Sequence, residues 1–137
     1  MPYRIILLIL VLLTASSCSS IRKYTVNEEF EVSSKSYNKM LRWHEWEKAA
    51  VAFASGPLRE NFALRMKAAE KITITDYRLK ARECNVEKGE AEVIIDIDYY
   101  VTPSVTIKTV EDSQKWKYSE ENGKKLWRLT TLFPEFK

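Results

Sequence analysis

The sequence has one histidine, two cysteines and three glycines among its 137 residues. This scarcity excludes several common kinds of site. A structural zinc site needs about four closely spaced cysteine or histidine ligands, and no such group occurs. There is also no Asp-x-Asp-x-Asp-Gly calcium loop and no glycine-rich loop that could hold a phosphate. We therefore predict neither a metal nor a cofactor.

The sequence also lacks a large excess of charge of either sign. Lysine and arginine total 22 against 19 acidic residues, and the two signs are interspersed, so no basic stripe suggests nucleic acid as a partner. Apolar residues make up 45% of the chain, a composition typical of a folded protein rather than a disordered one. The length allows one domain with its own core.

The longest apolar run lies near the N-terminus. Arg4 precedes an apolar stretch at residues 5–13, which is followed by small residues at 14–17 and then by Cys18. A transmembrane helix needs about 20 apolar residues, and this run has about half that number. The order of a basic residue, a short apolar run and small residues is typical of a secretory signal peptide.

The end of this segment, Ala15-Ser16-Ser17-Cys18, resembles the lipobox of bacterial lipoproteins. The resemblance implies cleavage between Ser17 and Cys18, with acyl chains such as palmitate on Cys18. The serine that follows implies export to the outer membrane, with the domain facing the periplasm. The alternatives are a plain cleaved signal and an uncleaved anchor with an incidental cysteine. With lipid on Cys18, Cys84 has no disulfide partner. We expect it to pack as a small apolar side chain.

These patterns divide the chain into a signal peptide at 1–17, a lipid-anchored linker at 18–33 and one domain at 34–137. Residues 19–31 mix polar with isolated apolar residues and show no helical period. We therefore expect a flexible spacer that holds the domain away from the membrane. An edge strand is the alternative for this stretch.

Two helices are expected at the start of the domain. Ser34 or Ser36 can cap the first, and apolar residues recur at helical spacing as far as Ala54. Gly56 is suited to end this helix and Pro57 to begin the next. The apolar stripe of the second helix consists of Leu58, Phe62, Met66 and Ala69.

From residue 72 the apolar period changes to two, which predicts β-strands. A third strand is expected from Val105, with a β-bulge between about 107 and 112. Asn122-Gly123 predicts a two-residue turn that pairs Tyr118 with Trp127 and Trp116 with Leu129. The expected fold class is α+β, with two N-terminal helices packed on a curved four-stranded antiparallel sheet.

This order of elements resembles the cystatin-like cone fold. The residues that carry the resemblance are Leu41-Arg42-Trp43 and the hairpin with Trp116-Lys117-Tyr118, Asn122-Gly123 and Trp127. Residues 34–133 are similar to bacterial proteins of the nuclear transport factor 2-like superfamily, although a helix between the first two strands is lacking. The resemblance implies isomerases, dehydratases, epoxide hydrolases or domains without a reaction, so the fold does not select a function.

An enzyme on this scaffold needs a titratable group inside the cone, and the candidate pocket residues are His44, Tyr77, Asp112 and Gln114. His44 lies on the apolar stripe of its helix, which favours a core or rim position over a general base. Asp112 and Gln114 are in phase with Trp116 and are expected to point inward. The acidic residues of the second strand are expected on the opposite, solvated face, and they are Glu92, Asp96 and Asp98.

We therefore expect a non-catalytic binding or interaction module of the cell envelope. Trp46 falls off the main stripe of its helix and is expected to be exposed. The outer face of the sheet is half apolar, which suits a homodimer or an envelope protein partner, through Ile94, Tyr100, Val105 and Ile107. The second hypothesis is a small-molecule isomerase or hydrolase with a pocket inside the cone.

Overall fold

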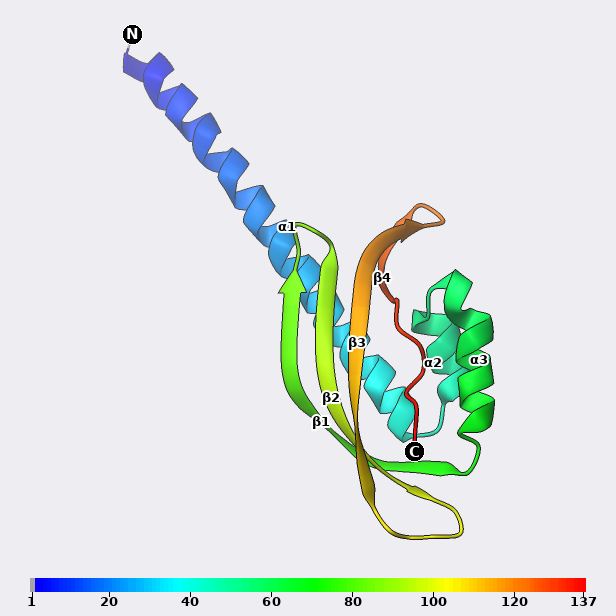
Figure 1. Ribbon diagram of the computed structural model, residues 1–137. Helices are drawn as coiled ribbons and strands as arrows, with labels where there is room; N and C mark the ends of the chain where they lie inside the picture. Colours follow the sequence, from blue (N-terminus) through cyan, green and yellow to red (C-terminus); the bar gives the residue numbers. More distant parts are fainter. Residues whose placement is uncertain (1) are drawn as a thin grey trace.

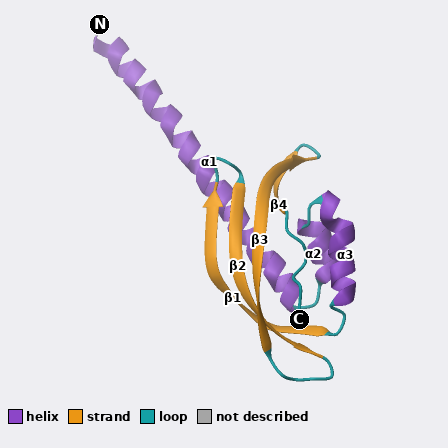
Figure 2. Cartoon of the chain, viewed as in Figure 1, coloured by secondary structure: helices purple, strands orange, loops and turns teal. Residues whose placement is uncertain are grey.

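The chain is described by a computed structural model that places the backbone of residues 2–137 and the side chains of residues 18–137. Figures 1 and 2 show its elements, which are α1 (Pro2–Arg42), α2 (Trp46–Phe53), the 3-10 turn η1 (Gly56–Leu58), α3 (Arg59–Ala68), β1 (Ile72–Asn85), β2 (Glu90–Val101), β3 (Lys108–Glu121) and β4 (Lys124–Leu129). The strands form one antiparallel sheet in the order β1-β2-β3-β4. The fold class is α+β, as the sequence predicts.

Helix α1 crosses one face of the curved sheet, and its buried side chains recur three or four residues apart (Figure 1). They are Val26, Phe30, Ser34, Tyr37 and Leu41, with Asn38 beside them. The Phe30 ring centroid lies 5.1 Å from that of Trp127 and 6.1 Å from that of Trp116. The indole Nε1 of Trp127 also donates to the Val26 carbonyl oxygen at 3.0 Å.

The prediction of a flexible linker at 18–33 is therefore wrong, and so is the alternative of an edge strand, because α1 is helical throughout this stretch and is buried on the sheet from Val26 onward. Val26 and Phe30 are one helical turn apart and continue the stripe of the following turns, so burial on the sheet stabilises the helix there. The folded domain begins before residue 34.

The first predicted helix is two helices with a break between them. α1 ends at Arg42 and α2 begins at Trp46, while His44 in the turn has a left-handed backbone with φ 59°. The turn is closed by the Glu45 N–H, which donates to the Met40 carbonyl oxygen at 2.9 Å. Gly56 likewise begins η1 instead of ending a helix.

The break decides which of two tryptophans is buried. Trp46 is buried, and its Nε1 donates to the Leu41 carbonyl oxygen at 2.9 Å. Trp43 is 66% exposed instead. The prediction of an exposed Trp46 is wrong because the turn resets the helical phase, so that α2 faces the core differently from α1.

The β-sheet follows the predicted alternation most closely in β2 and in the β3–β4 hairpin. The inward residues of β2 are all buried, namely Ala91, Val93, Ile95, Ile97 and Tyr99. Tyr118 pairs with Trp127 and Trp116 with Leu129, as predicted. Asn122 and Gly123 both have positive φ, 52° and 76°, which is the backbone that a tight hairpin turn between twisted strands requires.

The predicted start of the third strand and its bulge are wrong. β3 begins at Lys108, and its pairing with β2 has no register shift from Lys108 to Lys117. Val105 and Ile107 lie in the preceding connection and are exposed, so their phase does not have to match that of Trp116. The register shifts occur in β1, at Ile74/Asp76 and Leu79/Ala81, where they favour bending of the strand.

The segment after β4 completes the core from a position distant in sequence. Phe133 is fully buried, with ring centroids 4.9 Å from Trp46 and 5.4 Å from Phe62. Arg65 of α3 donates to the Phe133 carbonyl oxygen at 3.1 Å. The C-terminal segment therefore holds α2 and α3 against the sheet.

Trp127→Ala is expected to lower the free energy of unfolding by about 3–5 kcal/mol, because it removes a buried aromatic ring and leaves a cavity beside Phe30. Trp43→Ala is the matched control, since Trp43 is exposed, and it should change stability by less than about 0.5 kcal/mol. Denaturant melts measure both values. Similar losses for the two variants would contradict the assignment of the hairpin face.

Candidate functional site

A small polar cluster is enclosed between α1 and β3. Asp112 and Gln114 face inward beside Trp116, as the alternation predicts, and Asn38 of α1 meets them. Gln114 Nε2 donates to Asp112 Oδ2 and to Asn38 Oδ1, each at 2.8 Å. Asn38 Nδ2 donates to Gln114 Oε1 at 3.1 Å and to the Ser34 carbonyl oxygen at 2.8 Å. A reciprocal pair of amides thus joins the helix to the sheet.

Burial dominates the electrostatics of this cluster. It raises the pKa of Asp112 from 3.8 to about 6, although the Gln114 hydrogen bond and the Arg65 charge act in the opposite direction. Burial, followed by the charge of Asp112, also raises the pKa of Tyr37 well above its usual value. Tyr37 Oη and Trp116 Nε1 are buried without a hydrogen-bond partner among the residues whose side chains are described.

Aromatic rings fill the interior around these polar groups. The ring centroid of Tyr37 lies 5.7 Å from that of Trp116, 6.1 Å from that of Phe53 and 6.4 Å from that of Phe62. Asp112 itself is 9% exposed and Gln114 is 1% exposed. The cluster is therefore arranged to fix α1 on the sheet, and its carboxyl group can titrate near pH 6 while having little contact with solutes.

The four predicted pocket residues do not form one site. His44 is exposed in the α1–α2 turn, where its ring centroid lies 3.9 Å from that of Trp46. Tyr77 of β1 is half-buried and lines a shallow surface with Val32 and Lys39 of α1. His44 was expected at a core or rim position on a helical stripe. The break at Arg42 interrupts that stripe and leaves His44 exposed, so the core position is wrong.

The sequence interpretation missed two members of the cluster, Tyr37 and Asn38. Tyr37 belongs to the apolar stripe of the first predicted helix and is buried, but nothing in the sequence marks its hydroxyl group as unpaired. Asn38 gave the clearer signal, because it lies one turn after Ser34 and next to Tyr37 on a buried helix face. A polar side chain at such a position usually has a buried hydrogen-bonding partner.

Cys18 lies exposed on α1, near the end of the domain that carries the β1–β2 and β3–β4 turns (Figure 1). It lines an open concavity of about 640 Å³ together with Arg22, Lys23, Lys88 and Lys125. The backbone is helical from Cys18 to Val26, a rise of about 12 Å at 1.5 Å per residue. A group attached to Cys18 would thus be held close to the hairpin turns.

The expected signal peptide falls on residues whose side chains, including that of Ser17, lie outside the described part. The backbone of Pro2–Arg42 is helical. No helix among the described residues has an apolar stretch long enough to cross a membrane. The cleavage site between Ser17 and Cys18 stays a prediction.

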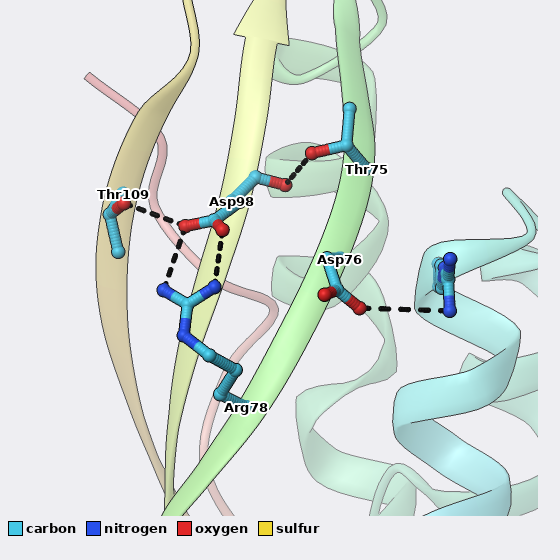
Figure 3. Close-up of polar contacts among 6 residues, drawn as sticks. Thr75, Asp76, Arg78, Asp98 and Thr109 are labelled. Carbon is cyan, nitrogen blue, oxygen red and sulfur yellow. Dashed lines mark hydrogen bonds and ion pairs between the residues drawn. The ribbon is translucent and has the colours of Figure 1, made fainter.

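The outer face of the sheet carries paired charges (Figure 3). Arg78 donates through both terminal nitrogens to the Asp98 carboxylate, and Thr109 Oγ1 donates to Asp98 Oδ1 at 2.6 Å. These hydrogen bonds lower the pKa of Asp98 from 3.8 to about 2. On the same face, Lys80 pairs with Asp96 and Glu111. The prediction that the charges of β2 point outward is confirmed, and in the described part of the chain no acidic group is arranged to hold a metal ion.

Asp112→Asn is expected to stabilise the protein by about 1–3 kcal/mol at pH 7–8, since about two pKa units correspond to at most about 3 kcal/mol. The native Asp112 pKa of about 6 exceeds the ordinary value of 3.8. Between these two values the native state binds a proton that the unfolded state lacks. Wild-type stability should therefore rise as the pH falls from about 7 to about 4, and the advantage of the variant should disappear there.

Thermal melts across this pH range test the prediction, with Asp76→Asn as the matched control. The Asp76 side chain is 54% exposed beside Arg42 (Figure 3), so its substitution should have a small effect that does not follow the same pH dependence. Destabilisation by Asp112→Asn at pH 8 would show instead that the native fold depends on an ionised carboxylate.

No family model and no curated protein matches the sequence. Among solved structures, the chain is similar to a SEC-C motif containing protein from Rhodopseudomonas palustris, with a TM-score of 0.55 and 9% identity over 72% of this chain and 73% of that chain. A protein from Mesorhizobium loti, named for SnoaL-like polyketide cyclases, matches with a TM-score of 0.37 and 19% identity over 74% of this chain and 98% of that chain. The first likeness shows a shared fold alone, and the second score is too low to support an argument.

Proposed function

We propose that the chain is a lipid-anchored, non-catalytic binding module of the bacterial cell envelope, held at the outer membrane and facing the periplasm. The observation that carries the proposal is the position of Cys18, which is exposed at one end of a helix whose later turns are packed into the domain core. The sequence before it has the order of a secretory signal, ending in a stretch that resembles a lipobox.

The proposed anchor is consistent with the energetics of membrane binding. Each buried methylene group of an acyl chain contributes about 0.8 kcal/mol, and stable anchoring needs two signals such as two acyl chains. The two or three chains that the lipobox resemblance implies on Cys18 would therefore suffice. Acyl chains are needed for this role, because the net charge of +3 is small and provides only a weak attraction to a membrane.

A binding role is supported by the filled interior of the cone, since partners would then meet the outside of the domain. The β2–β3 connection exposes Val105 by 81% and Ile107 by 53%. Figure 1 places this connection at the opposite end of the sheet from the turns near Cys18. We propose this connection as a contact for an envelope protein or for a second copy of the chain.

Cys18→Ser is expected to abolish lipid attachment, because a hydroxyl group cannot form the thioether to diacylglycerol. Labelling of cells with a clickable fatty acid should mark the wild-type protein and leave this variant unmarked. Intact mass should place the wild-type N-terminus at Cys18 with added lipid mass. Cys84→Ser is the matched control and should keep the label.

A mature N-terminus at any other residue, or a wild-type protein without lipid mass, would remove the basis for the anchor. Membrane location alone does not decide the matter, because an uncut signal can also hold the precursor at a membrane. The control variant detects acylation at the other cysteine, whose thiol is half-buried.

A small-molecule enzyme is the second candidate, and Asp112 favours it as an inward carboxyl group with a pKa of about 6. The purified protein should be screened against esters, epoxides and enolisable ketones. The binding proposal predicts no turnover above buffer. Turnover that is lost in Asp112→Asn and kept in Asp76→Asn would favour the enzyme.

A further inference from the structure

We propose that the end of the domain next to Cys18 binds anionic lipid headgroups and thereby orients the domain on the bilayer. This proposal rests on the lipid anchor proposed above. The surface, called here the membrane-proximal surface, consists of Arg22, Lys23, Lys88 and Lys125, which line the concavity beside Cys18, and of Ile21 and Tyr24 on the same turns of α1. All six side chains are exposed.

Basic side chains are concentrated on this surface. From Cys18 to residue 27 the only charged residues of α1 are Arg22 and Lys23, and the first acidic residue is Glu28. The β1–β2 turn adds Lys88, and the start of β4 adds Lys125. Positive charge at this place is complementary to the phosphate groups of anionic lipids.

The concavity beside Cys18 shows the same excess of positive charge. Its lining includes the four basic residues of the surface and a single acidic residue, Glu87. Lys23 Nζ pairs with Glu87 Oε1 at 2.8 Å, which leaves three basic groups in excess within the lining of the concavity. Outside this lining, Glu120 lies opposite Lys125 in the β3–β4 pairing. The net charge of the whole chain is also only +3, so the positive charge is distributed unevenly.

Two large exposed side chains on the same turns of α1 suit the membrane interface. Ile21 is 66% exposed and Tyr24 is 69% exposed. Along the helix Ile21 lies about 4.5 Å from Cys18, within the polar zone of a leaflet, which is roughly 5–8 Å thick. Tyr24 lies about 9 Å from Cys18, at the outer boundary of that zone. A tyrosine at this boundary can place its ring against the headgroups and its hydroxyl group in water.

The parts of this surface are fixed relative to one another. The Lys23–Glu87 pair joins α1 to the β1–β2 turn. Tyr118 Oη donates to Glu29 Oε2 at 3.1 Å, and the Tyr118 N–H donates to the Gly89 carbonyl oxygen at 2.8 Å. Acyl chains on Cys18 would hold this assembly at high local concentration on the bilayer, so that individually weak headgroup contacts add up.

Lysine acetylation of the intact lipidated protein tests the proposal. The protein is reconstituted into vesicles of phosphatidylcholine alone or of phosphatidylcholine with phosphatidylglycerol, and flotation first confirms that it is anchored. Mass spectrometry then compares acetylation rates. At Lys23, Lys88 and Lys125 the rate should fall at least about five-fold in the anionic vesicles, and high salt should reverse the effect. Lys48 and Lys67, on α2 and α3, are the controls and should react equally in both vesicles.

The double variant Lys88→Glu and Lys125→Glu should lose the anionic protection of Lys23, whereas Lys48→Glu with Lys67→Glu should keep it. Equal acetylation of the native protein in both kinds of vesicle, with flotation intact, would overturn the proposal that the membrane-proximal surface binds anionic lipids. The proposed anchor would be unaffected. Equal protection of the control lysines would overturn it too, because the contact would not be confined to this end. Failure of the native protein to float would instead contradict the proposed anchor.

Discussion

The packing of α1 against the β3–β4 hairpin is the contact on which the rest of the structure depends. Phe30 lies against the rings of Trp127 and Trp116, and Trp127 donates its Nε1 to the Val26 carbonyl oxygen. The aromatic contact buries apolar area, and the directional hydrogen bond fixes how far along its axis the helix lies. Once that position is set, the later turns of α1 reach the core beneath the curved sheet, and its earlier turns reach the β1–β2 and β3–β4 turns.

The enclosed polar cluster adds specificity to that contact at a cost in stability. An apolar helix face could slide or rotate on an apolar sheet, whereas the two amides of Asn38 and Gln114 match each other in only one arrangement. The cost appears in the raised pKa of Asp112 and in the buried polar atoms of Tyr37 and Trp116 that have no partner among the described side chains. Polar groups of this kind in a filled core are consistent with a role in holding α1 in register, and such a role needs no ligand.

Local patterns predicted the parts of the fold that depend on neighbouring residues. The alternation in β2 and the Asn122-Gly123 turn are confirmed because pairing and face follow from the turn itself. The continuity of α1 was missed since Val26 and Phe30 acquire a helical partner face only from the distant hairpin. The break at His44 was missed because neither glycine nor proline marks it, and burial of Trp46 beneath Phe133 depends on the far end of the chain. For the same reason, strand phase located Asp112 and Gln114 correctly but could not join them to Asn38.

The continuous helix changes what a lipid on Cys18 would do. A flexible spacer over residues 18–33 would spread over a root-mean-square distance of roughly 20 Å and allow every orientation of the domain. A helix from Cys18 to Val26 instead spans about 12 Å in a fixed direction, because Trp127 holds its last turn. The two ends of the sheet would then cease to be equivalent. The hairpin turns and their lysines lie near Cys18, and the connection with Val105 and Ile107 lies at the opposite end of the sheet (Figure 1). A rigid tether of this kind would favour partners that approach the end of the sheet away from Cys18, since a membrane would shield the other end.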